Sequence, residues 1–188
     1  MATSSRSPKK KPLLKTGPKH KEETLDFAAL RAAELEEWLP FLHGNRFASV
    51  VVVKGEPGVA ERSGQPPFFG EDGEALESAL AALGWGSNNW CGIALKLPGK
   101  GVLSAPDLRL LIEILDPRAL VALDSIAASM IQYCFGKELM PSFPEPGQKI
   151  WLLGRALVFV DGFESALASD DDEGAKRRVW RELKALKL

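Results

Sequence analysis

The sequence predicts an α/β fold, a three-layer α/β/α sandwich around a central four-stranded parallel sheet. Short apolar runs alternate along the chain with longer segments whose apolar residues recur at helical spacing. This alternation is typical of a parallel sheet covered by helices on both faces. Apolar residues make up 45% of the 188 residues, so the chain can bury a sizeable core. The length favours one domain, because domains commonly have about 100–150 residues.

Four segments are expected to form the strands. Residues 49–55 are an almost unbroken β-branched run, which is typical of a strand buried on both faces. Residues 90–96, 119–123 and 155–160 supply the other three strands. In sheets of this kind ligands bind beyond the carboxyl ends of the strands. Functional residues are therefore expected in the loops at these strand ends, which present Glu56 with Gly58, Asp124, and Asp161 with Glu164.

Helices are expected between the strands, because local signals mark their ends. Ser104 and Asp124 each precede an apolar helical stripe, and their side chains can accept bonds from first-turn amides. Gly84 and Gly136 follow two of the stripes, as glycine commonly does at a helix end. The expected helices cover residues 24–39 (closed by Pro40), 74–83, a segment from 104 to 115, a segment from 125 to 135, and a last segment that begins with the acids at 170–173.

The N-terminal segment differs in composition from the rest of the chain. Residues 1–23 are polar and Pro-bearing, so they are expected to form a disordered arm before a domain at residues 24–188. Residues 1–21 hold seven Lys and Arg, including Lys9, Lys10 and Lys11, and no acid. Residues 22–188 then carry a net charge of −8. The arm is either a tail that binds nucleic-acid phosphates or a solubilising spacer. Clusters of Lys and Arg bind nucleic acid because they release the counterions condensed on its phosphates.

Several classes of protein are excluded by the counts. Two cysteines, Cys91 and Cys134, do not make a disulfide framework, and with two histidines they fit no usual metal site, so no metal and no cofactor are expected. The longest apolar candidate for a span, residues 150–160, has 11 residues and contains Arg155, whereas a span requires about 20. The basic N-terminus lacks the apolar region of a secretory signal. We expect a cytoplasmic protein without membrane partners.

The loop at residues 55–70 (GEPGVAERSGQPPFFG) is the most informative segment. A glycine-rich turn after a buried strand lets backbone amides approach an anion or a base edge. The chain contains neither a P-loop nor a Gly-x-Gly-x-x-Gly motif. Phe68 and Phe69 offer a stacking face for a base, or else pack the loop onto the sheet; composition alone favours packing.

GEPG followed by SGQPPFFGEDGEAL resembles the first motif of the uracil-DNA glycosylase superfamily, most closely its thermophilic-type iron–sulfur branches. Residues 107–127 are similar to a helix–strand segment of that family. The segment from FVDGFESALAS to the closing helix has the position of its final motif. The resemblance spans about residues 46–188 and implies the same fold.

The resemblance also implies positions for a functional site. Base-binding positions fall on the loop and on the second expected strand: Gly55, Pro57, Gly58, Phe68 and Cys91. A water for hydrolysis would be positioned by Glu56, Glu61 or Asp161. DNA is the implied partner, contacted by the loops at the strand ends and by the arm at Lys9, Lys10 and Lys11.

Departures from the family pattern argue against ordinary uracil excision. The base-reading Asn falls on Cys91, and the catalytic His falls near Gly162. An iron–sulfur cluster requires four thiolates, and the chain has two cysteines. A base that is flipped into a pocket must be recognised by a side chain that reads its hydrogen-bonding edge. The negative charge on the departing base must be stabilised by a hydrogen-bond donor. For excision to persist, Asn88 or Asn89 would have to replace the reader, and Asp161 would have to position a water.

Three functions follow from these observations. The first is a catalytically degenerate domain that binds nucleic acid or a DNA-repair partner. The second is an active glycosylase for uracil or another damaged base with substituted catalytic residues. The third is a protein-interaction scaffold without DNA binding, which the net charge of −8 in residues 22–188 favours, because DNA-binding faces carry excess positive charge.

Overall fold

A computed structural model describes residues 35–86, 88–142, 144–168 and 173–187. Contacts divide the chain into the units Met1–Glu36 and Glu37–Leu188. The sheet and the helices that cover it belong to the second unit. The expected arm at residues 1–23, with Lys9, Lys10 and Lys11, and the expected boundary at residue 24 lie outside the described residues.

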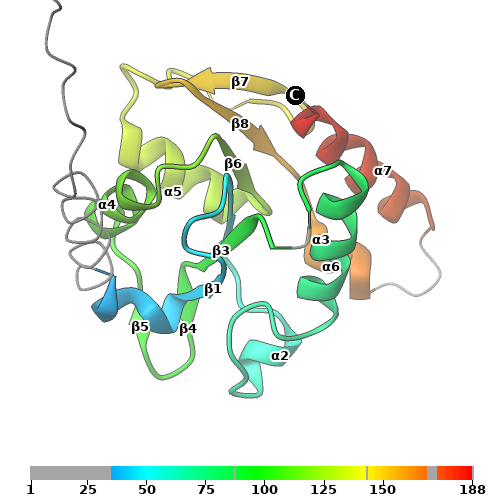
Figure 1. Ribbon diagram of the computed structural model, residues 1–188, viewed down its shortest axis with the longest axis horizontal. Helices are drawn as coiled ribbons and strands as arrows, with labels where there is room; N and C mark the ends of the chain where they lie inside the picture. Colours follow the sequence, from blue (N-terminus) through cyan, green and yellow to red (C-terminus); the bar gives the residue numbers. More distant parts are fainter. Residues whose placement is uncertain (1–34, 87, 143, 169–172, 188) are drawn as a thin grey trace, which may run out of the picture. The chain divides into compact units, whose positions relative to one another are not determined.

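A mixed six-stranded sheet forms the centre of the unit Glu37–Leu188 (Figure 1). The strand order is β1-β3-β2-β6-β8-β7. The inner strands are mutually parallel, and they are the four segments that the sequence predicts: β3 (Trp90–Ala94), β2 (Val50–Lys54), β6 (Ala119–Ala122) and β8 (Arg155–Phe159). The α/β class is therefore confirmed.

The expectation of a purely parallel four-stranded sheet is wrong, because an antiparallel strand is added at each edge. β1 (Leu42–Gly44) pairs with β3, and β7 (Lys149–Leu152) pairs with β8. β7 reaches β8 through a two-residue turn at Leu153 and Gly154, whose φ angles of 49° and 82° suit a tight hairpin. A positive φ at Leu153 gives no sequence signal, so the hairpin could not be predicted from turn residues.

Helices cover both faces of the sheet. Alternate strand residues such as Val52, Val121 and Val158 pack with α3 (Glu71–Ala82), α6 (Phe163–Ala168) and α7 (Glu173–Leu183) in one buried cluster. α4 (Ala105–Leu115) and α5 (Ser125–Phe135) lie together on the opposite face (Figure 1). This arrangement leaves the carboxyl ends of the parallel strands along one side of the sheet, which we call the sheet edge, with the loops to α2 (Val59–Arg62), α5 and α6.

Local signals predicted several helix ends correctly. The side chain of Ser104 accepts a bond from the Asp107 amide, and Asp124 accepts one from the Ala127 amide, as expected of N-caps. The described end of the expected helix at 24–39 is instead a 3-10 helix, η1 (Glu36–Phe41), that contains Pro40. α3 begins at Glu71, earlier than the expected residue 74, because its first turn includes three acids that suit a helix N-terminus.

Shorter elements complete the described fold. α2 (Val59–Arg62) is a single turn within the glycine-rich loop, and η2 (Lys184–Leu186) follows α7. β4 (Lys96–Leu97) and β5 (Gly101–Val102) form a separate two-stranded hairpin. Within the described ranges, none of the helices has the length and apolar character needed to cross a membrane.

Candidate functional site

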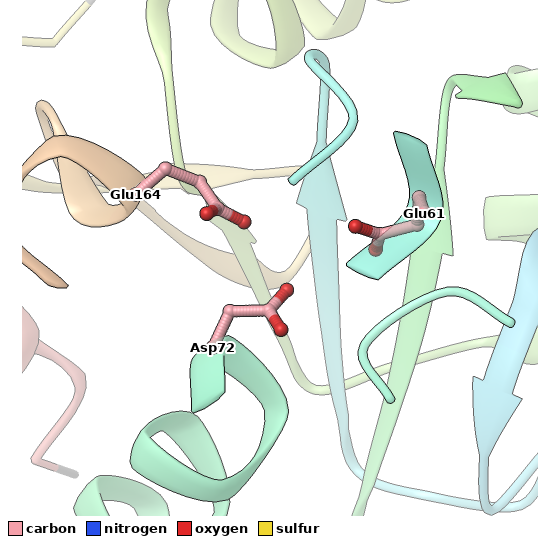
Figure 2. A group of neighbouring side chains, drawn as sticks. All are labelled: Glu61, Asp72 and Glu164. Carbon is pink, nitrogen blue, oxygen red and sulfur yellow. The ribbon is translucent and has the colours of Figure 1, made fainter. Parts of the chain in front are cut away.

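A buried lysine marks the carboxyl end of the central strand β2. Lys54 is 1% exposed, and its ammonium contacts three carboxylates from three different elements. The Nζ–Oε1 distance is 2.5 Å to Glu61 and 3.1 Å to Glu164, and Nζ also bonds Oδ2 of Asp72. We call Glu61, Asp72 and Glu164 the acidic cluster. Its carboxylates point toward one another across the strand end (Figure 2).

Each member of the acidic cluster is placed by its own short element. Glu61 lies in α2, the single turn that follows Pro57 and Gly58. Asp72 lies in the first turn of α3, and Glu164 lies in the first turn of α6. The helix starts bring carboxylates to the sheet edge, and the ammonium of Lys54 holds them there. The contact between Lys54 and Glu164 joins residues 110 apart in sequence.

Burial and ion pairing shift the pKa values of Lys54 and of the acidic cluster in different directions. Burial alone would lower the pKa of Lys54, but its bonds to Asp72 and Glu61 raise that pKa above its usual value. Burial disfavours the ionised Asp72, yet the bond from Lys54 holds the pKa of Asp72 below its usual value. Burial raises the pKa of Glu164, and its weaker contact with Lys54 only partly offsets this. Lys54 therefore stabilises the charge of Asp72 more than the charge of Glu164.

One oxygen of the acidic cluster remains without a partner. Glu61 is 1% exposed, and its Oε1 accepts bonds from Lys54 and from the Phe68 amide, the latter at 2.9 Å. Its other oxygen, Oε2, is buried and has no hydrogen-bond partner among the residues that the structure describes. A buried carboxylate oxygen without a donor is unfavourable. The hydrogen bonding of the acidic cluster is therefore incomplete at this oxygen.

An aromatic cluster of His43, Phe68 and Trp90 adjoins the lysine. Phe68 is 2% exposed and has a φ of 56°, which aims its ring inward from the loop. The ring meets Trp90 edge-on with centroids 5.6 Å apart, and the Lys54 ammonium lies 4.5 Å from its centroid. His43 stacks obliquely on Trp90, and burial lowers the pKa of His43. Phe68 thus packs the loop onto the sheet, whereas Phe69 is 62% exposed.

Gly92 makes this packing possible. A Cβ at Gly92 would lie 2.4 Å from Cε2 of Phe68, so the ring sits directly against the β3 backbone. Cys91, the preceding residue, is fully buried within β3 between β1 and β2. Burial raises the pKa of the Cys91 thiol to about 12, which makes it a neutral, enclosed side chain.

The structure places the other predicted residues on separate parts of the sheet edge. Gly55 and Glu56 donate their backbone amides to Oδ2 of Asp124, at 2.7 and 3.3 Å, and the Glu56 side chain is exposed. The Pro57 carbonyl accepts a bond from Arg62. Asp161 is exposed, and its backbone amide donates to Glu182. Of the three proposed water-positioning acids, Glu61 alone belongs to the acidic cluster.

Lys54 and Asp72 were missed by the sequence analysis, and Glu164 was named only as an acid in the loop after the last predicted strand. Lys54 was assigned only to a strand, although a charged residue that ends a run of four valines is an available signal. Asp72 and Glu164 are acids at helix starts, and nothing local distinguishes them from ordinary helix-start acids. Their convergence on Lys54 depends on tertiary contacts.

Two cavities flank the acidic cluster. One, of about 300 Å³, includes Glu61 in its wall together with Pro66, Pro67 and Pro98. The other, of about 310 Å³, is lined in part by Asp72 and Glu164, with Gly70 beside them. Phe68 lines neither cavity. Glu164, whose side chain is 33% exposed, is therefore the carboxylate that solvent reaches, whereas the side chains of Glu61 and Asp72 and the Phe68 ring are enclosed.

Comparisons with known proteins assign no family to this geometry. No protein-family model matches the chain, and no curated protein sequence matches it. The functional conclusion therefore rests on the residues at the sheet edge and on the sequence of the arm.

Proposed function

We propose that this chain is a uracil-DNA glycosylase-like domain that no longer excises uracil and that binds nucleic acid through its basic arm. The observation that carries the proposal is the enclosure of Phe68 by Lys54, Trp90 and Gly92. Phe68 is the aromatic residue that the first motif would offer to a base. Base-flipping enzymes stack the extruded base on such side chains. A ring that is 2% exposed offers no free face for this.

The position that aligns with the family's catalytic histidine also supports loss of excision. Gly162 has a φ of 69°, a conformation that disfavours any residue with a side chain. A Cβ there would lie 2.8 Å from Oγ of Ser165. The leaving base anion needs a donor, and removal of one such donor typically costs about 100- to 1,000-fold in rate. Gly162 supplies no side chain for this role.

The base-reading position leads to the same conclusion. Cys91 stands where the family has Asn, and it is fully buried inside the sheet. An amide can pair with the donor–acceptor edge of uracil, whereas a neutral thiol is a weak donor and a weak acceptor. Reading a base at this position would require both another side chain and an opened strand.

Charge favours the arm as the nucleic-acid contact. The sheet edge presents the exposed or partly exposed acids Glu56, Asp124, Asp161 and Glu164, and these would repel a phosphate backbone. The arm carries Lys9, Lys10 and Lys11 with no acid nearby. Binding through such a cluster is driven by counterion release, so it is salt-dependent and has little sequence preference.

Salt-dependent binding of labelled DNA tests this proposal. Anisotropy titrations would compare the full chain with a variant in which Lys9, Lys10 and Lys11 are replaced by Gln. If three phosphates are contacted, duplex affinity should fall by about 40-fold between 50 and 200 mM salt. The variant should lose most of the affinity and most of the salt dependence. Equal binding by the variant would contradict the proposed role of the arm.

A matched control keeps the total charge change the same. Arg118, Lys137 and Lys187 are exposed on the folded unit, and replacing all three by Gln also removes three positive charges. This control should bind DNA nearly as tightly as the unaltered chain. A loss as large as that of the arm variant would mean that net charge, rather than the arm, determines binding.

A protein partner is the second candidate, and one observation favours it. The cavity of about 300 Å³ is lined mainly by leucines and prolines, Leu39, Pro40, Leu42, Pro66, Pro67, Leu97 and Pro98. Concave surfaces of this composition are suited to an apolar or Pro-rich segment. The absence of any salt-dependent DNA binding by the full chain would favour this scaffold function over the first proposal.

A further inference from the structure

The acidic cluster keeps carboxylate oxygens that Lys54 does not use. The bonds to the ammonium involve Oε1 of Glu61, Oδ2 of Asp72 and Oε1 of Glu164. The second oxygen of each carboxylate lies outside these bonds, and Oε2 of Glu61 is buried without any partner in the described part of the chain. The three carboxylates come within 4.8 Å of one another, a separation that one ion can bridge.

Gly58 leaves room beside these oxygens. A Cβ at Gly58 would lie 2.8 Å from Oε2 of Glu61 and 2.7 and 3.0 Å from the two oxygens of Glu164. Oε2 of Glu61 and both oxygens of Glu164, of which Oε1 also bonds Lys54, therefore face one point next to a residue without a side chain. The φ of Gly58 is −72°, so the backbone itself does not require glycine. The missing side chain keeps this space open.

The charge of the cluster fits a divalent ion. With all three carboxylates ionised, the acidic cluster and Lys54 together carry two negative charges. We propose that Glu61, Asp72 and Glu164 bind one hard divalent cation, Mg²⁺, Mn²⁺ or Ca²⁺, on the side of the cluster that faces away from Lys54. Such ions prefer carboxylate oxygens, and an ion would give Oε2 of Glu61 the partner it lacks.

Solvent access to the proposed site comes from the cavity of about 310 Å³. Asp72 and Glu164 contribute to its wall, and Glu164 has a side chain that is 33% exposed. Mg²⁺ in particular keeps several of its waters, so it needs an open side rather than a closed protein cage. This site does not involve the arm, so its test is independent of the test of DNA binding.

Mn²⁺ is the probe for this site, because its free ion is counted directly by electron paramagnetic resonance. Titration of the full chain should reveal one Mn²⁺ site, and added Mg²⁺ or Ca²⁺ should displace the ion. The Glu164→Gln variant should bind Mn²⁺ at least about tenfold more weakly, since even supporting residues of metal sites cost that much. Glu138→Gln, an equal charge change at an exposed residue, should bind normally.

Gly58→Ala gives a second variant that keeps every charge. Its Cβ would enter the space that the ion requires, so Mn²⁺ binding should again fall by at least about tenfold. Far-UV circular dichroism and urea unfolding would verify that both variants are folded. The proposal is overturned if the full chain binds no Mn²⁺, or if both Glu164→Gln and Gly58→Ala bind it as well as the unaltered chain does.

Discussion

The ammonium of Lys54 lies 4.5 Å from the centre of the Phe68 ring. The same ammonium bonds all three members of the acidic cluster, so one side chain connects that cluster to the aromatic cluster of His43, Phe68 and Trp90. The carboxyl end of β2 is therefore filled by side chains of the protein itself. This filling is the structural reason to expect no base excision at this strand end.

Replacing Lys54 should destabilise the fold strongly. In Lys54→Met the acidic cluster keeps its buried carboxylates but loses the ammonium that compensates them. Removing one partner of a buried ion pair typically costs about 3–5 kcal/mol. Urea unfolding followed by tryptophan fluorescence measures this loss. Lys96→Met, at an exposed lysine of β4, is the control and should cost little. A loss below about 1 kcal/mol for Lys54→Met would contradict this role.

Neutralising Asp72 should lower the stability of the fold, whereas neutralising Glu164 should not. The pKa of Asp72 lies below its ordinary value of 3.8 in the folded protein. Its ionised form therefore stabilises the fold above pH 3.8, and this contribution is lost as pH falls through the folded-state pKa. The pKa of Glu164 is raised above 4.5, so its ionisation opposes folding as pH rises. At pH 7, Asp72→Asn should lower the free energy of unfolding by about 1.5–3 kcal/mol, whereas Glu164→Gln should leave it unchanged or raise it.

The measurement for this pair is urea unfolding at pH 7 in buffer with EDTA, which removes any divalent ion. Lys54 limits the stability of the fold at alkaline pH. Because its pKa is raised in the folded state, its contribution to the free energy of unfolding is complete below pH 10.5 and is lost as pH rises through the folded-state pKa. Equal destabilisation by both variants at pH 7 would show that the ammonium supports both carboxylates alike, contrary to the structure.

Cys91 should be inert to thiol reagents in the native protein. It is fully buried, and burial raises its pKa to about 12, so almost no thiolate forms at pH 8. Cys134 is partly exposed, with a pKa raised to about 11, and should react slowly. The Cys134→Ala variant should therefore show no reaction with Ellman's reagent until urea unfolds it. Rapid reaction in the native state would mean that β3 opens and that Cys91 reaches solvent.

The contact between Gly92 and Phe68 should tolerate no side chain. Gly92→Ala would place a Cβ 2.4 Å from Cε2 of Phe68, so the ring must move. Overpacking of this kind costs about 1–3 kcal/mol. Gly174→Ala, at an exposed position within α7, is the matched control and should be stabilising, as alanine is in a helix. Equal stability of Gly92→Ala and the unaltered chain would mean that the Phe68 ring is not held there.

The central part of the fold could be predicted because its signals are local. The valine run of β2 and the caps at Ser104 and Asp124 each identify an element within a few residues. The edge strands β1 and β7 carry no such signal: β1 has three residues, and β7 enters its hairpin through Leu153. α6 was missed for a similar reason, since its six residues contain little helical periodicity.

The candidate site was less predictable than the fold. Its loop was identified from glycines and prolines, and Glu61 was named, but as a residue that positions water. The contact of Lys54 with Glu164 joins residues 110 apart in sequence, so only the folded chain brings them together. The inward orientation of Phe68 depends on a φ of 56° and on the absence of a side chain at Gly92, which the sequence does not connect.

Formation of abasic sites in uracil-containing DNA tests the central claim most directly. Single- and double-stranded substrates would be incubated with protein in excess over DNA, and Asp161→Asn and Phe68→Ala would be assayed in parallel. With the Phe68 ring enclosed and no side chain at Gly162, we predict no product above the protein-free control. Abasic product that decreases in either variant would contradict it, because it would mean that a working base pocket opens at this sheet edge.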